Sequence, residues 1–295
     1  MEEDLLSIAA GCPSLTILDV AHNRGCAAVT ERALLALAAG CTGLQIVDVS
    51  ECNIGVTDAV LNALGANCGA QLKFVGVSGC AGVTPAALAA LAAQCPQLHE
   101  LHAGRCGGVD DALLRALAAH CPRLRLLNIS DGGGRVSEAA LRQLLAGCPA
   151  LRSLLAASCA RGVTDGLLRQ LATRLPGLES LCVSACAQGV TEGALLALAQ
   201  GCKQLRYLDV SYNPLVTDAG VQAVAGACSQ VRMRARGCGS IASPASADAY
   251  LYPHTSWSGC TPTCATASPR RASSAPCSRR VARHAAAACI PARSC

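Results

Sequence analysis

Apolar residues recur along this chain in a unit of about 27 positions. The first part of the unit follows the pattern L-x-x-L-x-V, and its last two apolar positions are two residues apart, as on one face of a strand. Eight segments carry this pattern, among them residues 15–20, 44–49, 72–77 and 205–210. We expect eight short strands whose first, fourth and sixth positions point into the core.

The second part of the unit, V-T-D-x-x-L-x-x-L-x-x-x-C, predicts a helix. Thr57 and Asp58 begin one such helix, because the Thr hydroxyl can cap free N–H groups and the acid favours the positive end of the helix dipole. Leu61, Leu64 and Cys68 then lie on one helical face. Similar starts occur at Thr164–Asp165, Thr191–Glu192 and Thr217–Asp218. Proline ends the helix after Cys95, Cys121 and Cys148.

The closing cysteine marks the period of the unit. It occurs at Cys12, Cys41, Cys68, Cys95, Cys121, Cys148, Cys202 and Cys228, with gaps of 29, 27, 27, 26, 27, 54 and 26 residues. The gap of 54 is two periods, and Leu175 stands where the missing cysteine would be. A fixed period of this length indicates one strand–helix unit that is copied and stacked.

A short residue follows each strand, three positions after its last apolar residue. The residues at this position are Asn23, Cys52, Cys80, Cys106, Gly132, Cys159, Cys186 and Asn213. The turn after a strand leaves backbone groups facing the core, and a short donor or acceptor can satisfy them. We expect the Asn and Cys side chains to do so.

These motifs resemble the cysteine-containing leucine-rich repeat. They are similar to the repeat arrays of F-box/LRR substrate receptors and of their relatives without an F-box, over roughly residues 1 to 238. The resemblance implies an α/β fold: a horseshoe-shaped leucine-rich-repeat solenoid with a parallel sheet on the concave face and helices on the convex face. It also implies that partners dock on the concave face or at the end of the array.

The array is expected to begin inside a repeat, with a helix that starts at Met1 and turns Leu5 and Ile8 inward. In the family, an F-box lies upstream of the repeats and recruits a ubiquitin ligase through a Skp-type adaptor. We therefore expect a Skp-type adaptor as partner only if an F-box precedes this sequence.

The ninth copy is expected to close the array poorly. Counting from Val231 puts Arg234 and Arg236 at inward strand positions, where an unpaired Arg is costly. We expect this strand to be displaced or frayed.

Residues 239–295 are rich in Ser, Ala, Pro, Arg and Cys, and we expect a disordered tail. A contact between this basic tail and an acidic partner, or a metal site at His254, Cys260 and Cys264, is the alternative.

Charge and cysteine content narrow the class of protein. Through Cys238 there are 18 Lys plus Arg and 18 Asp plus Glu, so the net charge of +5 comes from the tail, and a nucleic-acid partner is not expected. Sixteen of the 21 cysteines lie in the repeats. Neither a signal peptide nor an apolar run of membrane-spanning length is evident. We expect a monomer with reduced cysteines in the cytoplasm, with a nuclear, cytoskeletal or ciliary location as the alternative.

The residue pattern indicates no catalytic or cofactor site. The chain has neither a H-E-x-x-H motif nor a phosphate-binding loop. His102 and Cys182 share one strand position, but they are three repeats, or roughly 15 Å, apart. We expect neither an enzyme nor a bound cofactor or metal.

The third and fifth strand positions are expected to face the concave side. Near the N-terminus they place Ile17, Ile46 and Phe74 beside Asp19 and Asp48. We predict that the three apolar residues anchor a protein or peptide ligand and that the two acids favour a basic one. The alternative is that such residues merely suit a sheet surface.

Tyr207, Asp209 and Tyr212 form a second predicted patch near the C-terminal end of the array. A substrate-recognition or adaptor array, as in SCF-type ubiquitin ligases that direct protein degradation, is the favoured function. A structural protein of a cytoskeletal or ciliary assembly is the alternative.

Overall fold

The computed structural model describes residues 2–21, 29–132 and 134–239. The chain divides into two units, Met1–His254 and Thr255–Cys295, and every described residue belongs to the first. All but one residue of the predicted tail at 239–295 therefore lies outside the described residues, as do Met1 and Asn23.

Helices and strands alternate along the described residues. The helices are α1 (Glu2–Gly11), α2 (Glu31–Gly40), α3 (Asp58–Cys68), α4 (Pro85–Gln94), α5 (Asp111–His120), α6 (Glu138–Gly147), α7 (Asp165–Arg174), α8 (Glu192–Gly201) and α9 (Asp218–Ala227), with a short 3₁₀ helix η1 (Ala187–Gly189) before α8. The strands are β1 (Ile17–Asp19), β2 (Ile46–Asp48), β3 (Phe74–Gly76), β4 (Glu100–His102), β5 (Leu126–Asn128), β6 (Ser153–Leu155), β7 (Ser180–Cys182), β8 (Tyr207–Asp209) and β9 (Arg232–Arg234).

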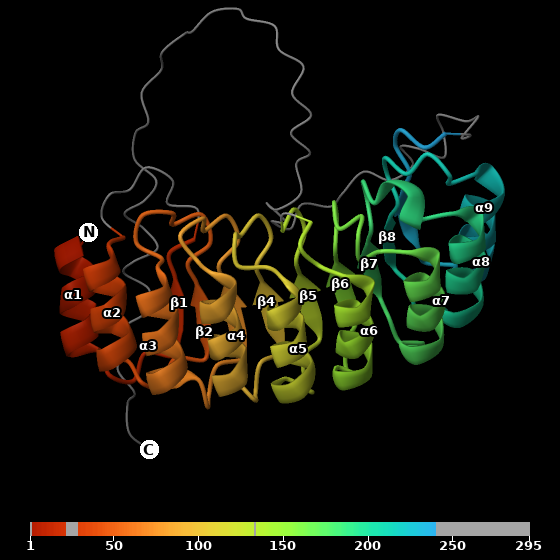
Figure 1. Cartoon of the computed structure of the whole chain (residues 1–295). Helices are drawn as coiled ribbons and strands as arrows, with labels where there is room; N and C mark the ends of the chain where they lie inside the picture. Colours follow the sequence, from red (N-terminus) through yellow and green to blue (C-terminus); the bar gives the residue numbers. More distant parts are fainter. Residues whose placement is uncertain (1, 22–28, 133, 240–295) are drawn as a thin grey trace, which may run out of the picture. The chain divides into compact units, whose positions relative to one another are not determined.

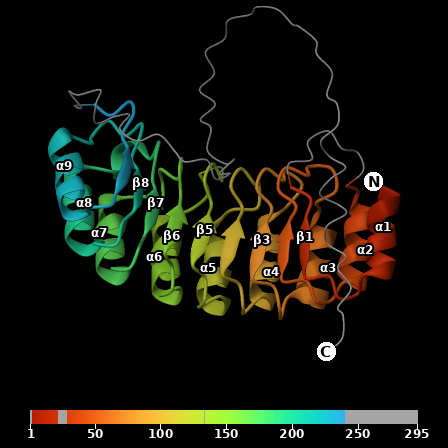
Figure 2. The same ribbon diagram turned by 180° about the vertical axis from the view of Figure 1, so that it is seen from behind.

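The described strands form one parallel sheet of nine strands in chain order. Equivalent residues of successive repeats are paired, for example Ile17 with Ile46 and Ile46 with Phe74. The helices line one side of this sheet (Figure 1, and from behind in Figure 2), and we call the opposite side the open face. The predicted leucine-rich-repeat solenoid is confirmed.

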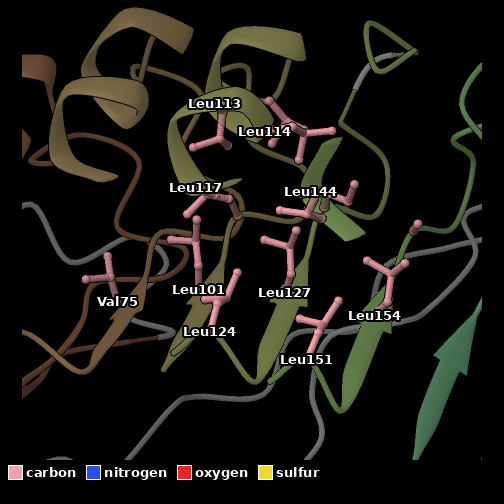
Figure 3. Packing of buried hydrophobic residues seen from close by; sticks show 14 of the residues in the cluster. Val75, Leu101, Leu113, Leu114, Leu117, Leu124, Leu127, Leu144, Leu151 and Leu154 are labelled. Carbon is pink, nitrogen blue, oxygen red and sulfur yellow. The ribbon is translucent and has the colours of Figure 1, made fainter. Parts of the chain in front are cut away.

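The core lies between the sheet and the helices. The middle residue of each strand points inward, and Figure 3 shows Leu101 and Leu127, from β4 and β5, directed at Leu117 and Leu144, from α5 and α6. All four side chains are buried. Burying one such side chain stabilises the fold by about 1.5–3 kcal/mol, so a thin core repeated along the array provides much of its stability.

Leu175 continues the cysteine series, as predicted. Its N–H donates to the Leu171 carbonyl at 2.8 Å, just as the Cys148 N–H donates to the Leu144 carbonyl at 2.8 Å. Leu175 is buried and its backbone angles, φ −123° and ψ 63°, match those of the cysteines that end other helices. The stacking series is therefore unbroken from α1 to α9.

The short residues after the strands satisfy backbone groups, as expected. The Cys52 thiol donates to the Val20 carbonyl at 3.1 Å, and the Cys80 thiol donates to the Val49 carbonyl at 3.4 Å. The Asn213 amide donates to the carbonyls of Val183 and Val210, both at 2.9 Å. Each such side chain joins two successive repeats.

Of the two expectations for the ninth strand, fraying is wrong, whereas displacement is confirmed because its register is shifted by one residue. β9 pairs in parallel with β8, and the pairing of Leu208 with Met233 places Met233, not Arg234, at the inward position. Ala235 is buried, whereas Arg236 is exposed. The ninth repeat is one residue shorter between Val231 and its strand, and this shift keeps the arginines out of the core, where an unpaired charge is costly.

The helices begin at the predicted residues, but two of the Thr hydroxyls do not cap their own helices. Thr57, Thr164, Thr191 and Thr217 are all N-cap residues, yet Thr57 and Thr191 make no side-chain cap hydrogen bond. The Thr57 hydroxyl instead donates to the Glu31 carboxylate at 2.6 Å, and the Thr191 hydroxyl donates to Asp165. The acid that opens one helix is thus bonded to the cap of the next.

Candidate protein-interaction face

The open face carries a continuous apolar row at its N-terminal end. Ile17, Ile46 and Phe74 are paired neighbours on β1, β2 and β3. The Ile17 side chain is 55% exposed, while Ile46 and Phe74 are half-buried. The structure therefore brings the three predicted apolar residues together, and we call them the apolar row.

Phe74 also has a partner on the next strand. Its ring centroid lies 5.0 Å from that of His102, with the two planes tilted by 34°. The His102 Nε2 is in turn 3.7 Å from a Glu100 carboxylate oxygen. Interaction with His102 lowers the pKa of Glu100 below its ordinary value against the opposing effect of burial. His102 thus helps to hold the Phe74 ring, a role that the sequence analysis missed because it depends on diagonal contact between strands.

Asp19 and Asp48 flank the apolar row, and each also has a structural role. Oδ1 of Asp19 accepts from the Ala21 N–H at 3.1 Å, and Oδ1 of Asp48 accepts from the Ser50 N–H at 3.0 Å. This i to i+2 bond is the Asx turn that ends a strand. Within the described part of the chain, the second carboxylate oxygen of each residue makes no hydrogen bond.

The second predicted patch is brought together only in part. Tyr212 is exposed, but Asp209 is only 7% exposed. The Asp209 carboxylate accepts from the Ser211 N–H at 3.0 Å and from the Tyr207 hydroxyl at 3.4 Å. Tyr207 is half-buried and packs against a small cluster of Leu155, Ala157 and Cys182. Asp209 is consequently less accessible than its strand position predicts.

An ion pair that the sequence analysis missed links the second and fourth repeats. The Arg105 guanidinium pairs with the Glu51 carboxylate, and Gly79 of the third repeat lies between them. A Cβ on Gly79 would lie 2.6 Å from Oε2 of Glu51, so a side chain there would displace the pair. All three residues have positive φ, of 65°, 72° and 55° for Glu51, Gly79 and Arg105. A glycine between an acid and a base at one repeat position is the signal that could have revealed this pair.

The buried cysteines are unreactive thiols. Burial raises the pKa of Cys95, Cys121 and Cys148 to about 12, so these thiols are not nucleophiles near neutral pH. The Cys121 thiol donates to the carbonyls of Ala92 and Cys95, at 3.4 and 3.5 Å. No disulfide joins two cysteines of the described residues. Their role there is to join neighbouring repeats.

The described residues contain neither a metal-binding cluster nor a membrane-spanning helix. No group of three or more His, Cys, Asp or Glu side chains there could hold a metal ion. None of the helices there is both long and apolar enough to cross a bilayer.

A parallel sheet built from one strand and one helix per repeat, with a thiol or amide bonded to the backbone at most of the described turns, defines a leucine-rich-repeat solenoid. Comparison with protein families agrees. Residues 57–190 match the family described as FBD-associated F-box protein At5g56370, LRR repeats, and residues 201–225 match a leucine-rich-repeat family. The chain is a leucine-rich-repeat protein, and its repeats resemble those of F-box proteins.

One solved structure shares the fold at low sequence identity, and a second is similar to a lesser degree. A chain in the crystal structure of the Rad7 and Elc1 complex in yeast is 18% identical, with a TM-score of 0.57, over 79% of this chain and 65% of that one. The leucine-rich repeat-containing protein LegL7 from Legionella pneumophila is 16% identical, with a TM-score of 0.47, over 78% of this chain and 85% of that one. This chain thus spans less than two thirds of the yeast chain. No curated protein matches the sequence.

Proposed function

We propose that this leucine-rich-repeat array is a non-catalytic module that recognises a protein or peptide segment on its open face. The observation that carries the proposal is the apolar row, Ile17, Ile46 and Phe74, which is contiguous and accessible and lies beside the carboxylates of Asp19 and Asp48. Apolar anchors within a polar rim are typical of the residues that dominate protein interfaces. The acids favour a ligand with a basic residue near its apolar anchors.

The finer proposal is that the ligand is a substrate presented for ubiquitination. Two likenesses support it: the family match of residues 57–190 to the repeats of an F-box protein, and the shared fold with a chain of the yeast Rad7 and Elc1 complex. A Skp-type adaptor would take part only if an F-box is encoded upstream of this sequence. An in-frame F-box in the gene would favour this role over a structural role in a cytoskeletal or ciliary assembly.

The first prediction tests the open face directly. Phe74→Ala combined with Ile46→Ala removes two anchors, and we expect the variant to lose at least one partner that the intact chain captures from cell extract, as identified by mass spectrometry. Truncating a central anchor costs an interface about 2 kcal/mol or more, which corresponds to a loss of roughly thirtyfold in affinity.

The matched control is Ile54→Ala combined with Leu196→Ala. These two apolar residues are exposed but lie in the turn after β2 and on α8, away from the apolar row. Circular dichroism melting would verify that all three proteins are folded. Identical sets of captured partners for the intact chain and the Phe74 variant would contradict the proposed function.

A further inference from the structure

A second feature of the array is a line of basic residues along the edge of the sheet where its strands begin. The residue just before the strand is Lys73 for β3, His99 for β4, Arg125 for β5 and Arg152 for β6. We call these four residues the basic row. Glu179 interrupts the line before β7, and Arg206 resumes it before β8.

The backbone places these residues side by side. The His99 N–H donates to the Lys73 carbonyl at 2.8 Å, the Arg125 N–H to the His99 carbonyl at 2.7 Å, and the Arg152 N–H to the Arg125 carbonyl at 2.8 Å. Each residue is therefore in register with the next, at the spacing of neighbouring strands. Three such steps make the basic row about 14 Å long.

The basic side chains of the row are accessible to solvent, at least in part, and form no ion pair among the described residues. Lys73, Arg125 and Arg152 are exposed and His99 is half-buried. The ion pairs among the described residues involve Arg105, Arg142, Arg169 and His102, and none includes a member of the row. Within the described part of the chain, Lys73 Nζ donates only to a neutral acceptor, Oε1 of Gln45, at 2.8 Å.

Members of the basic row help to lower the pKa of one nearby carboxylate. Glu100, on β4, has a pKa lowered chiefly by His102, with smaller contributions from His99 and Arg125. The field of the row thus extends onto the open face and stabilises a negative charge there. A single carboxylate cannot balance the whole row.

We propose that the basic row binds an acidic stretch of the same protein ligand that the open face recognises. This inference rests on the proposed function. A length of about 14 Å accommodates roughly five residues of an extended chain at about 3.3 Å per residue. With Asp19 and Asp48 at the other end of the face, the ligand is bipolar: its basic part lies over β1 and β2 and its acidic part over β3 to β6.

The charge balance favours a polypeptide over a nucleic acid. Residues 1–238 carry 18 basic and 18 acidic side chains, and Glu100 and Glu179 lie beside the row. Nucleic-acid footprints need an extended positive surface that neutralises many phosphates, and four basic residues next to carboxylates do not supply one.

The second prediction is a binding measurement on the full chain. The probe is a fluorescein-labelled ten-residue peptide that contains five consecutive Glu residues, followed by anisotropy at low salt, with five Gln residues in the reference peptide. We expect the Glu peptide to bind at least tenfold more tightly than the Gln peptide. Arg125→Glu combined with Arg152→Glu should weaken the Glu peptide at least tenfold, while Arg125→Lys combined with Arg152→Lys should restore most of the binding.

The matched control is Arg32→Glu combined with Arg174→Glu, on α2 and α7. It makes the same change in net charge at two exposed arginines of the helical side. An equal loss in this control would show an effect of net charge alone and overturn the inference. Tighter binding of a single-stranded oligonucleotide of ten nucleotides than of the Glu peptide, with the same dependence on Arg125 and Arg152, would overturn it as well.

The same variants separate this inference from the proposed function. If capture from cell extract is lost with Phe74→Ala plus Ile46→Ala but is unchanged by Arg125→Glu plus Arg152→Glu, the basic row has no part in recognition and the proposed function stands. If neither pair changes capture, the proposed function itself fails.

Discussion

At the scale of single residues, cysteine and asparagine play the same role in different repeats, because each donates a hydrogen bond to a backbone carbonyl of the preceding repeat. Asn213 is fully buried, donates to the carbonyls of Val183, Val210 and Ser211 and accepts from the Cys186 N–H at 3.0 Å. Cys80 and Cys186 bond to the preceding repeat more simply, because each thiol donates to one carbonyl of that repeat. The exchange is tolerated because either side chain offers a donor at the point where the turn leaves a carbonyl unpaired.

The third prediction concerns this position. Asn213→Ala leaves buried backbone groups without a partner and should lower the free energy of unfolding by about 2–4 kcal/mol, since each such group costs roughly 1–3 kcal/mol. Asn213→Cys restores a donor and should cost clearly less. Urea denaturation followed by circular dichroism measures both. Equal losses would mean that packing, rather than hydrogen bonding, makes the position important.

At the scale of elements, the helices are joined through their first turns. Asp58 of α3 accepts from the Thr84 N–H at 2.8 Å and from its hydroxyl at 2.6 Å. Asp111 of α5 accepts from Ser137 in the same way, with both distances 2.7 Å. The acid after the cap therefore does more than complement its own helix dipole, because it fixes the start of the next helix.

The fourth prediction is a pH dependence at Asp111. Burial alone would raise the pKa of this carboxyl, but the hydrogen bonds from Ser137 and the charges of Arg115 and Arg161 hold the pKa below its ordinary value. A lowered folded pKa means stability that is present above the unfolded pKa, near 3.9, and is lost as the pH falls through the folded value. Asp111→Asn should therefore lower the urea midpoint more at pH 7 than at pH 3.

A control for this experiment is Glu179→Gln, at an exposed carboxylate before β7 that bonds to no helix cap in the described part of the chain. Its effect should be small at both pH values. If Asp111→Asn lowered the midpoint equally at pH 7 and pH 3, the charge of Asp111 would have no part in joining α5 to α6.

At the scale of the whole molecule, stability is a sum over repeats and the contacts between neighbours. The last repeat has a neighbour on one side only among the described residues, and its strand forms because the chain omits one residue after Val231. Met233 and Ala235 then pack toward the core while Arg232 faces out.

The fifth prediction distinguishes the observed register of β9 from the register that counting from Val231 predicts. Ala235→Asp places a charge in a buried position and should release α9 and β9, seen as faster amide hydrogen exchange confined to the C-terminal repeats. Arg232→Asp, at an exposed position of the same strand, should leave exchange nearly unchanged. Similar exchange in both variants would contradict the observed register.

Much of the fold could be predicted because stacked repeats make equivalent residues neighbours. The strands around Leu18 and Val75, the caps at Thr164 and Thr217 and the substitution at Leu175 all followed from position in the period. The same counting placed the apolar row on one face. It failed at β9, where a one-residue deletion is invisible to a fixed period and the cost of burying Arg decides the register.

What the sequence determined by itself was the local pattern: which side chains face inward, where each helix begins and ends, and which residues share a row across the sheet. The tertiary structure decided the contacts between long or polar side chains of different repeats, such as Glu51 with Arg105 across Gly79, Phe74 with His102 and Asp111 with Ser137. Periodicity fixes backbone positions, but the direction that a flexible side chain takes depends on the space and the partners that neighbouring repeats leave for it.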